Sequence, residues 1–338
     1  IHSSGRNARK LIEQSRDRVA KLIKTSPEQV IFTSGGTEAN NLVIDGINRD
    51  HCLISAIEHD SILQTDKLHR KILVNESGFV ELATLEKLLR GKDSPNIVSV
   101  MLANNETGVI QPIEEIVKLS QPFDAFVHTD AIQACGKVNL DWGILGVDAL
   151  SLSAHKIGGP QGVGALILNK KFDLDARFFG GGQERSYRPG TENVPGIVGF
   201  GLAAELAADL DRNKGIELLR NELERKILKI APNAVIHGQQ SQRIPNTSCI
   251  SMPGVLAETQ IMKFDLAGIM VSAGSACSSG KVQNSHVLRA MGVKESEASS
   301  AIRISLGYDN TIDEIDYFVK QWKKISDVVG SGNLREVA

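Results

Sequence analysis

One lysine stands where its amine could react with a carbonyl group. The apolar run 149–152 leads through Ser153 and His155 to Lys156, and a glycine-rich turn separates this lysine from the next apolar run, 165–168. Apolar surroundings disfavour an ammonium ion, so we expect a partly desolvated amine that can form a Schiff base. A solvated lysine in an ordinary turn between two strands is the alternative that this segment alone leaves open.

Four further apolar runs are each followed by polar side chains with chemical potential. These are Thr37 after 30–33, His59 after 53–56, Asn105 after 97–102, and Asp130 with Gln133 after 126–129. Because the runs alternate with segments of helical periodicity, we expect an α/β fold with a mainly parallel sheet covered by helices on both faces. The carboxyl ends of parallel strands meet at one edge, which predicts a rim of hydroxyl, imidazole, amide, carboxylate and amine groups.

The segment 34–41 after the first of these runs is suited to an anion. It contains small residues and hydroxyls, and it opens an apolar helix. Unpaired N–H groups at the start of a helix favour negative charge, so the segment predicts a phosphate site. An ordinary helix cap made by Ser34 or Thr37 is the alternative.

The periodicity of the remaining chain predicts two domains. We expect helices at 7–24, 61–73, 82–89, 113–120 and 311–329, a largely helical stretch at 193–230, and further strands at 248–252 and 302–306. We expect a second domain to start at Asp211, which divides the chain into a large domain, 1–210, and a smaller α+β domain, 211–338. Lys156 and Asp130 fall in the former.

Composition narrows the class of protein. The 338 residues carry 38 Lys and Arg against 40 Asp and Glu, a formal charge of −2, which points to neither a nucleic acid nor a membrane as partner. Four cysteines without a CxxC pair predict neither zinc nor a disulfide framework, so a reducing compartment, the cytoplasm, is expected. The chain begins at Ile1 rather than Met, and we expect its true beginning to be absent.

Taken in order, the motifs resemble those of a known family. They stand at 32–41, 58–59, 104–108, 129–133, 153–156, 188–193, 274–280 and 302–307. Over nearly the whole chain they are similar to the cysteine desulfurases, the class V aminotransferase branch of the fold-type I pyridoxal phosphate enzymes. The resemblance implies a large domain with a seven-stranded type of sheet and a smaller C-terminal domain that carries a catalytic cysteine loop.

The resemblance also implies a role for each motif residue. Lys156 would carry pyridoxal phosphate, Asp130 would pair with its pyridine nitrogen, and His59 would stack on the ring and move protons. The remaining cofactor contacts would come from Asn105 and Gln133 near the phenolic oxygen and the substrate, and from Gly36, Thr37, Ser153 and His155 around the phosphate. Thr191 would reach the phosphate of the partner subunit, which implies a homodimer, and Arg303 would clamp the substrate carboxylate.

Cys277 indicates the reaction. It lies in the small, chargeless segment 272–280, where a thiol is less readily buried than Cys52, Cys135 and Cys249, which sit beside apolar residues. As a thiolate it would take the sulfur of L-cysteine as a persulfide and leave alanine, with an iron–sulfur scaffold protein as the implied acceptor. A selenocysteine lyase, another class V aminotransferase, and a sulfur-relay subunit without turnover are the alternatives.

Overall fold

The computed structural model describes residues 2–49, 51–91, 96–175, 177–274 and 285–330, and the chain forms two compact units. The first unit comprises Ile1–Leu73, Val80–Ala103 and Gln111–Leu210. The second comprises Val74–Phe79, Asn104–Ile110 and Asp211–Ala338. The second unit therefore takes up two short segments from the first 210 residues.

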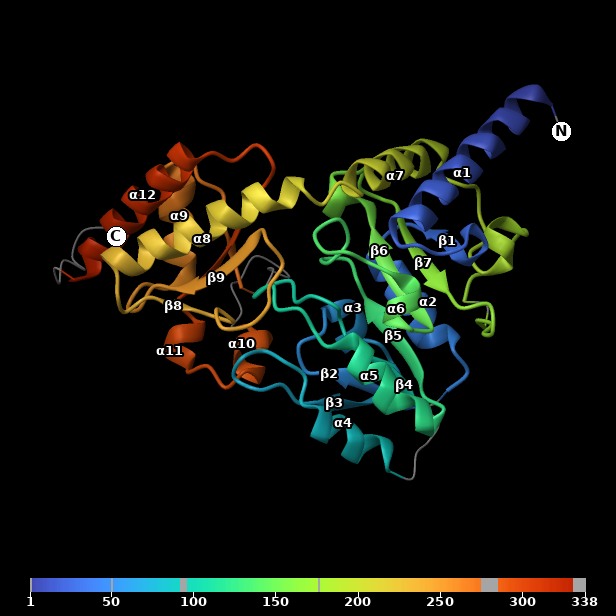
Figure 1. Ribbon diagram of the computed structural model, residues 1–338, viewed down its shortest axis with the longest axis horizontal. Coiled ribbons are helices and arrows are strands. Elements are labelled where there is room, and N and C mark those ends of the chain that lie inside the picture. The colour runs from blue at the N-terminus through green and yellow to red at the C-terminus, as the bar shows by residue number, and fades with distance from the viewer. Residues whose placement is uncertain (1, 50, 92–95, 176, 275–284, 331–338) are drawn as a thin grey trace. The chain divides into compact units, whose positions relative to one another are not determined.

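A seven-stranded sheet forms the centre of the first unit, in the order β1-β7-β6-β5-β4-β2-β3 (Figure 1). The strands are β1 Val30–Thr33, β2 His51–Ser55, β3 Leu68–Ile72, β4 Ile97–Ser99, β5 Phe126–Asp130, β6 Ala149–Ser153 and β7 Gly164–Leu168. The five strands from β3 to β6 pair in parallel, whereas β7 is antiparallel to both β6 and β1. This mainly parallel α/β sheet confirms the fold expected from the sequence.

Helices pack against this sheet because its strands are apolar on both faces; every residue of β1, β5, β6 and β7 is buried. The helices are α1 Ser3–Leu22, α2 Gly36–Gly46, α3 Asp60–Leu63, α4 Leu82–Leu89, α5 Ile113–Ser120, α6 Trp142–Leu145 and α7 Val194–Ala207, with 3-10 turns η1 Pro27–Gln29, η2 Gln121–Phe123, η3 Ala154–Ile157 and η4 Gln183–Ser186. Helices α1 and α7 lie side by side (Figure 1), and a Cβ on Gly201 would stand 2.7 Å from the Cβ of Ser15. Such a close approach of two helices requires glycine.

The helix predicted at 61–73 is wrong. The structure has the four-residue helix α3, and then the edge strand β3, which pairs in parallel with β2 from His51↔Leu68 to Ser55↔Ile72. Only Ile72 of β3 is buried, and Leu68 is exposed. The charged residues of an edge strand therefore mimic the pattern of an amphipathic helix, and pairing with β2 decides the conformation.

The second unit is a smaller α+β structure around an antiparallel sheet in the order β10-β11-β9-β8. Its strands are β8 Val235–Ile236, β9 Thr247–Ser251, β10 Ser272–Ala273 and β11 Ala301–Ser305, and its helices are α8 Arg212–Ile230, α9 Ala257–Leu266, α10 His286–Ala290, α11 Glu295–Ala298 and α12 Ile312–Gly330. In its core Trp322 is buried beside the stacked rings of Phe264 and Phe318, whose centroids are 4.7 Å apart.

Candidate active site

The direction of the strands brings several predicted residues to one edge of the first unit's sheet. Because β7 is antiparallel to β1 and to β6, the carboxyl ends of β1, β2, β4, β5 and β6 share that edge. Gly164 lies there between Thr33 and Ser153 in the register. A Cβ on Gly164 would stand 2.7 Å from the backbone of both Gly35 and Leu152, so only glycine lets the loop after β1 lie against β6.

The loop after β1 starts helix α2 without a side-chain cap. Its N-cap residue is Gly35, so neither Ser34 nor Thr37 caps the helix. Gly36 packs against the loop after β5, since a Cβ there would stand 2.0 Å from Cδ1 of Ile132 and 3.6 Å from Cβ of Ser153. The exposed Thr37 follows. This helix start therefore keeps N–H groups and a hydroxyl for an anion.

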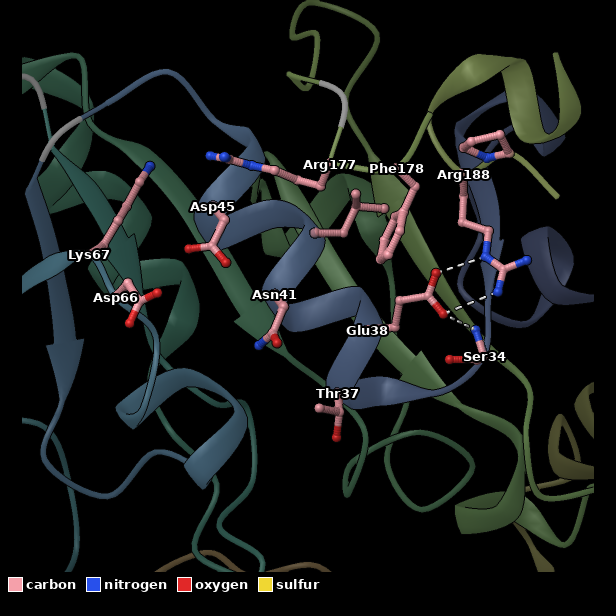
Figure 2. Close-up of a pocket in the computed structure, with 12 residues that line it drawn as sticks. Ser34, Thr37, Glu38, Asn41, Asp45, Asp66, Lys67, Arg177, Phe178 and Arg188 are labelled. Carbon is pink, nitrogen blue, oxygen red and sulfur yellow. Dashed lines mark hydrogen bonds and ion pairs between the residues drawn. The ribbon is translucent and has the colours of Figure 1, made fainter. Parts of the chain in front are cut away.

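A cavity of about 820 Å³ lies beside this helix start. Figure 2 shows Thr37 at one end of it and Glu38 between Arg188 and the backbone of Ser34. Arg188 Nε donates to Glu38 at 2.8 Å and Ser34 N–H donates at 2.7 Å. Burial alone would raise the pKa of Glu38, but these hydrogen bonds lower it, so the carboxylate fixes the loop before α2.

Asp130 supplies a buried carboxylate at the end of β5. It is 5% exposed; Oδ1 accepts the N–H of Ile132 at 2.9 Å, and Oδ2 accepts Nδ2 of Asn40 at 2.8 Å. Burial raises the pKa of Asp130, while those hydrogen bonds and the charges of His59 and Lys156 act in the opposite direction. A buried carboxylate in this setting is stabilised as an anion by an incoming cation, such as a protonated ring nitrogen.

His59 is held in one tautomer by the start of α3. Its Nδ1 accepts the N–H of Ser61 at 3.0 Å and lies 2.9 Å from the hydroxyl oxygen of Ser61. With Nδ1 accepting, the neutral ring carries its proton on Nε2. The structure thus gives His59 a hydrogen-bond donor at Nε2, a property that its place in the sequence does not reveal.

Lys156 lies in the 3-10 turn η3 that follows β6, and its side chain is exposed. The expected desolvation is therefore not found in this chain, because η3 carries the lysine beyond the buried end of the strand. Its neighbour His155 is held by the hydroxyl of Ser153, 2.9 Å from Nδ1. Burial, and then the charge of Lys156, lower the pKa of His155.

Sequence reasoning missed Lys137. Its Nζ donates to the carbonyl of Gln133 at 2.8 Å, one turn earlier in the loop after β5. Burial, with a contribution from the charge of Lys156, lowers the pKa of Lys137 to about 8. The i, i+4 spacing to Gln133 was the available signal, but the proximity of two lysines arises only in the fold.

Two predicted substrate residues belong to the second unit. Arg303 on β11 donates from Nη1 to the carbonyl of Asn105 at 2.9 Å. Nε of Arg303 and Oδ1 of Asn105 are buried and have no hydrogen-bond partner within the described part of the chain. Such atoms are costly unless a ligand satisfies them: the N–H at Nε of Arg303 can donate to a carboxylate, and Oδ1 of Asn105 can accept from a donor such as an ammonium group.

The structure describes Thr191 and three of the four cysteines. Thr191 is an exposed residue of the first unit. Cys277 lies outside the described residues. Cys52, Cys135 and Cys249 are buried free thiols, as expected, and burial raises the pKa of each.

The described residues contain no group of three or more His, Cys, Asp or Glu side chains that could hold a metal ion. Among the helices that the structure describes, none is both long and apolar enough to cross a membrane.

Comparison with known proteins identifies the family to which this sequence and fold are similar. The model of the aminotransferase class-V family matches residues 1–318. A protein named cysteine desulfurase IscS from Dictyoglomus turgidum is 40% identical over 341 residues, covering 96% of this chain and 86% of that protein. A cysteine desulfurase from Cereibacter sphaeroides is 40% identical over 343 residues, covering 97% and 87%. The crystal structure of a NifS-like protein from Rickettsia africae matches with a TM-score of 0.90 and 41% identity, over 97% of this chain and 91% of that one. The chain belongs to the class-V aminotransferase family, in the branch that contains the cysteine desulfurases.

Proposed function

We propose that this chain is a pyridoxal phosphate-dependent cysteine desulfurase, which removes sulfur from L-cysteine and releases L-alanine. The observation that carries the proposal is the sheet edge of the first unit. There a buried carboxylate, an exposed lysine and an uncapped helix start occur together, at Asp130, Lys156 and α2. These groups complement the ring nitrogen, the aldehyde and the phosphate of the cofactor.

The residues present fit pyridoxal phosphate. Gly36, Thr37, Ser153 and His155 would hold the phosphate, with Gln133 near the phenolic oxygen. When bound, the cofactor draws electrons from the substrate and makes its Cα proton acidic. Lys156 would hold the aldehyde of the cofactor and, once the substrate amine has replaced it, would take that proton.

Asp130 and His59 would prepare the ring from its edge and its face. As an anion, the carboxylate of Asp130 would keep a proton on the ring nitrogen. His59 would stack on the ring and would offer its Nε2–H to the reacting groups, because Nδ1 accepts the N–H of Ser61. Asn105 and Arg303 would bind the substrate, Arg303 through its carboxylate.

Cys277 would receive the sulfur. Its thiolate attacks the sulfur of the bound cysteine, the Cβ–S bond of the substrate breaks, and a persulfide forms on Cys277. The electron pair of the broken bond stays with the carbon skeleton, which takes up protons and leaves as alanine. We further propose a cytoplasmic homodimer, in which the exposed Thr191 reaches the partner's phosphate site, and an iron–sulfur scaffold protein as the sulfur acceptor.

The test is intact-mass analysis of the purified chain after brief exposure to cysteine, with alanine measured in the same tube. Borohydride reduction should fix the cofactor to the Lys156 peptide, and one sulfur atom should add to the Cys277 peptide. Cys277→Ser should keep the cofactor and lose the persulfide, whereas Lys156→Ala should lose the covalent cofactor. Bound cofactor with no sulfur transfer and no alanine would refute desulfuration, and a strong preference for selenocysteine would favour a lyase of the same branch.

A further inference from the structure

Asn40 links Asp130 to Ser61, the residue that contacts His59, but has no role of its own in the proposed site so far. It lies in the second turn of α2 and is 0% exposed. Its Nδ2 donates to Oδ2 of Asp130 at 2.8 Å and to the hydroxyl of Ser61 at 2.9 Å. One amide group therefore joins α2 to the end of β5 and to α3.

The orientation of this amide is fixed by its surroundings. The Ser61 hydroxyl oxygen lies 2.9 Å from Nδ1 of His59 and accepts from Nδ2 of Asn40, and the carboxylate of Asp130 can only accept. Rotating the amide by half a turn would place Oδ1 of Asn40 against the carboxylate of Asp130. In the observed orientation Oδ1 is buried and has no hydrogen-bond partner. The fold accepts this cost so that both N–H groups can donate.

We propose that Asn40 is a positioning residue that holds the Asp130 carboxylate as an anion aimed at the ring nitrogen of the cofactor. The inference rests on the proposed function. A hydrogen bond to a charged acceptor in a buried site is stronger than one between neutral groups. Burial favours the neutral form of Asp130, and the donor from Asn40 and the N–H of Ile132 oppose this effect by favouring the anion. Asn40 would then affect the cofactor only through Asp130, and only at the ring nitrogen that Asp130 contacts.

The test measures binding of two cofactors to the full chain after the native cofactor has been removed. One is pyridoxal phosphate, and the other is its 1-deaza analogue, in which a C–H replaces the ring nitrogen. In Asn40→Leu, affinity for pyridoxal phosphate should fall about tenfold to hundredfold. Affinity for the analogue should change less than about threefold, because the analogue offers Asp130 no ring nitrogen.

Asn41→Ala is the matched control. Asn41 is the next residue of α2 and faces the cavity shown in Figure 2, and its Nδ2 donates to the backbone carbonyl of Ser61 at 2.5 Å. This variant loses a hydrogen bond on the same helix without touching Asp130. It should therefore keep the wild-type ratio of the two affinities.

Equal losses for both cofactors in Asn40→Leu would show a merely structural role and overturn the proposal, as would no loss for either. Circular dichroism checks that the variant folds; if it does not, Asn40→Ser carries the same comparison, because its hydroxyl is too short to reach Asp130. If the wild-type chain binds neither compound, the proposed function itself fails. If it binds both and the ratio is unchanged in the variant, only the role of Asn40 fails.

Discussion

Acid should destabilise this protein through a histidine buried inside its sheet. His128 lies on β5, is 0% exposed, and its two ring nitrogens lie 2.8 Å from the hydroxyl of Ser99 on β4 and 3.0 Å from that of Ser151 on β6. Burial lowers the pKa of His128 from 6.5 to about 3. The ring therefore stays neutral in the folded protein at pH values where the unfolded chain binds a proton.

The size of the effect follows from the two pKa values. Because the unfolded state binds more protons below pH 6.5, the free energy of unfolding falls as the pH falls. Between pH 7 and pH 5 this group alone should lower it by about 2 kcal/mol. This change depends little on the pKa of His128 in the folded state, since any pKa well below 5 leaves the ring of the folded protein neutral at pH 5.

The assay compares His128→Gln with the wild type by urea unfolding at pH 5 and pH 7, followed by circular dichroism. The variant is less stable at both pH values, but its loss between pH 7 and pH 5 should be smaller by about 2 kcal/mol. His2→Ser, which removes an exposed imidazole and keeps an acceptor at the start of α1, should retain the wild-type dependence. An equal loss in His128→Gln and wild type would refute the reasoning.

Three further predictions concern buried groups near the same sheet. Burial raises the pKa of Glu58 to about 8, so the folded state keeps this proton to higher pH than the unfolded state does. In urea unfolding, the free energy of unfolding of the wild type should therefore fall by about 2 kcal/mol between pH 6.5 and pH 9, and that of Glu58→Gln should not fall in this way. Gly36→Ala should lower stability by about 1–3 kcal/mol in thermal unfolding, because the new Cβ meets Ile132, and Ile132→Val should restore part of the loss. Arg16 and Glu184 form a buried bidentate ion pair, so Arg16→Met and Glu184→Gln each leave one charge buried without its partner. In urea unfolding each variant should lower the free energy of unfolding by about 3–5 kcal/mol, and the double variant should lower it by less than the sum of the two.

The sequence predicts the central strands well because they are buried on both faces. The apolar runs 126–129 and 149–152 nearly coincide with β5 and β6, all of whose residues are buried. Continuous apolar runs followed by polar residues are typical of such strands, and the strand ends then place Asp130 and Lys156 near each other. The sequence left open whether Ser34 or Thr37 caps α2, and the structure decides this with Gly35 at the N-cap and no side-chain cap.

Edge elements and contacts between distant segments could not be predicted in the same way. The segment 61–73 has charges that fit a helix as well as an edge strand, and only pairing with β2 decides between them. The exposure of Lys156 depends on how far η3 extends beyond β6. The hydrogen bond of Asn40 to Asp130 joins residues 90 positions apart, so nothing local in the sequence signals it.

The polar groups buried around Asp130 are arranged so that little negative charge surrounds it. His128, two residues earlier on the same face of β5, is neutral. Glu58, in the turn that follows β2, is largely protonated at neutral pH because burial raises its pKa to about 8. The charge of Asp130 also raises the pKa of Glu58, so the two buried carboxylates avoid being ionised together. Asp130 differs from Glu58 in accepting the side-chain donor of Asn40 and in the nearby Lys156, so we expect a cation that reaches this edge of the sheet to pair with Asp130. The neutral groups that make the protein sensitive to acid and base thus also limit the negative charge that would compete with Asp130 for a cation.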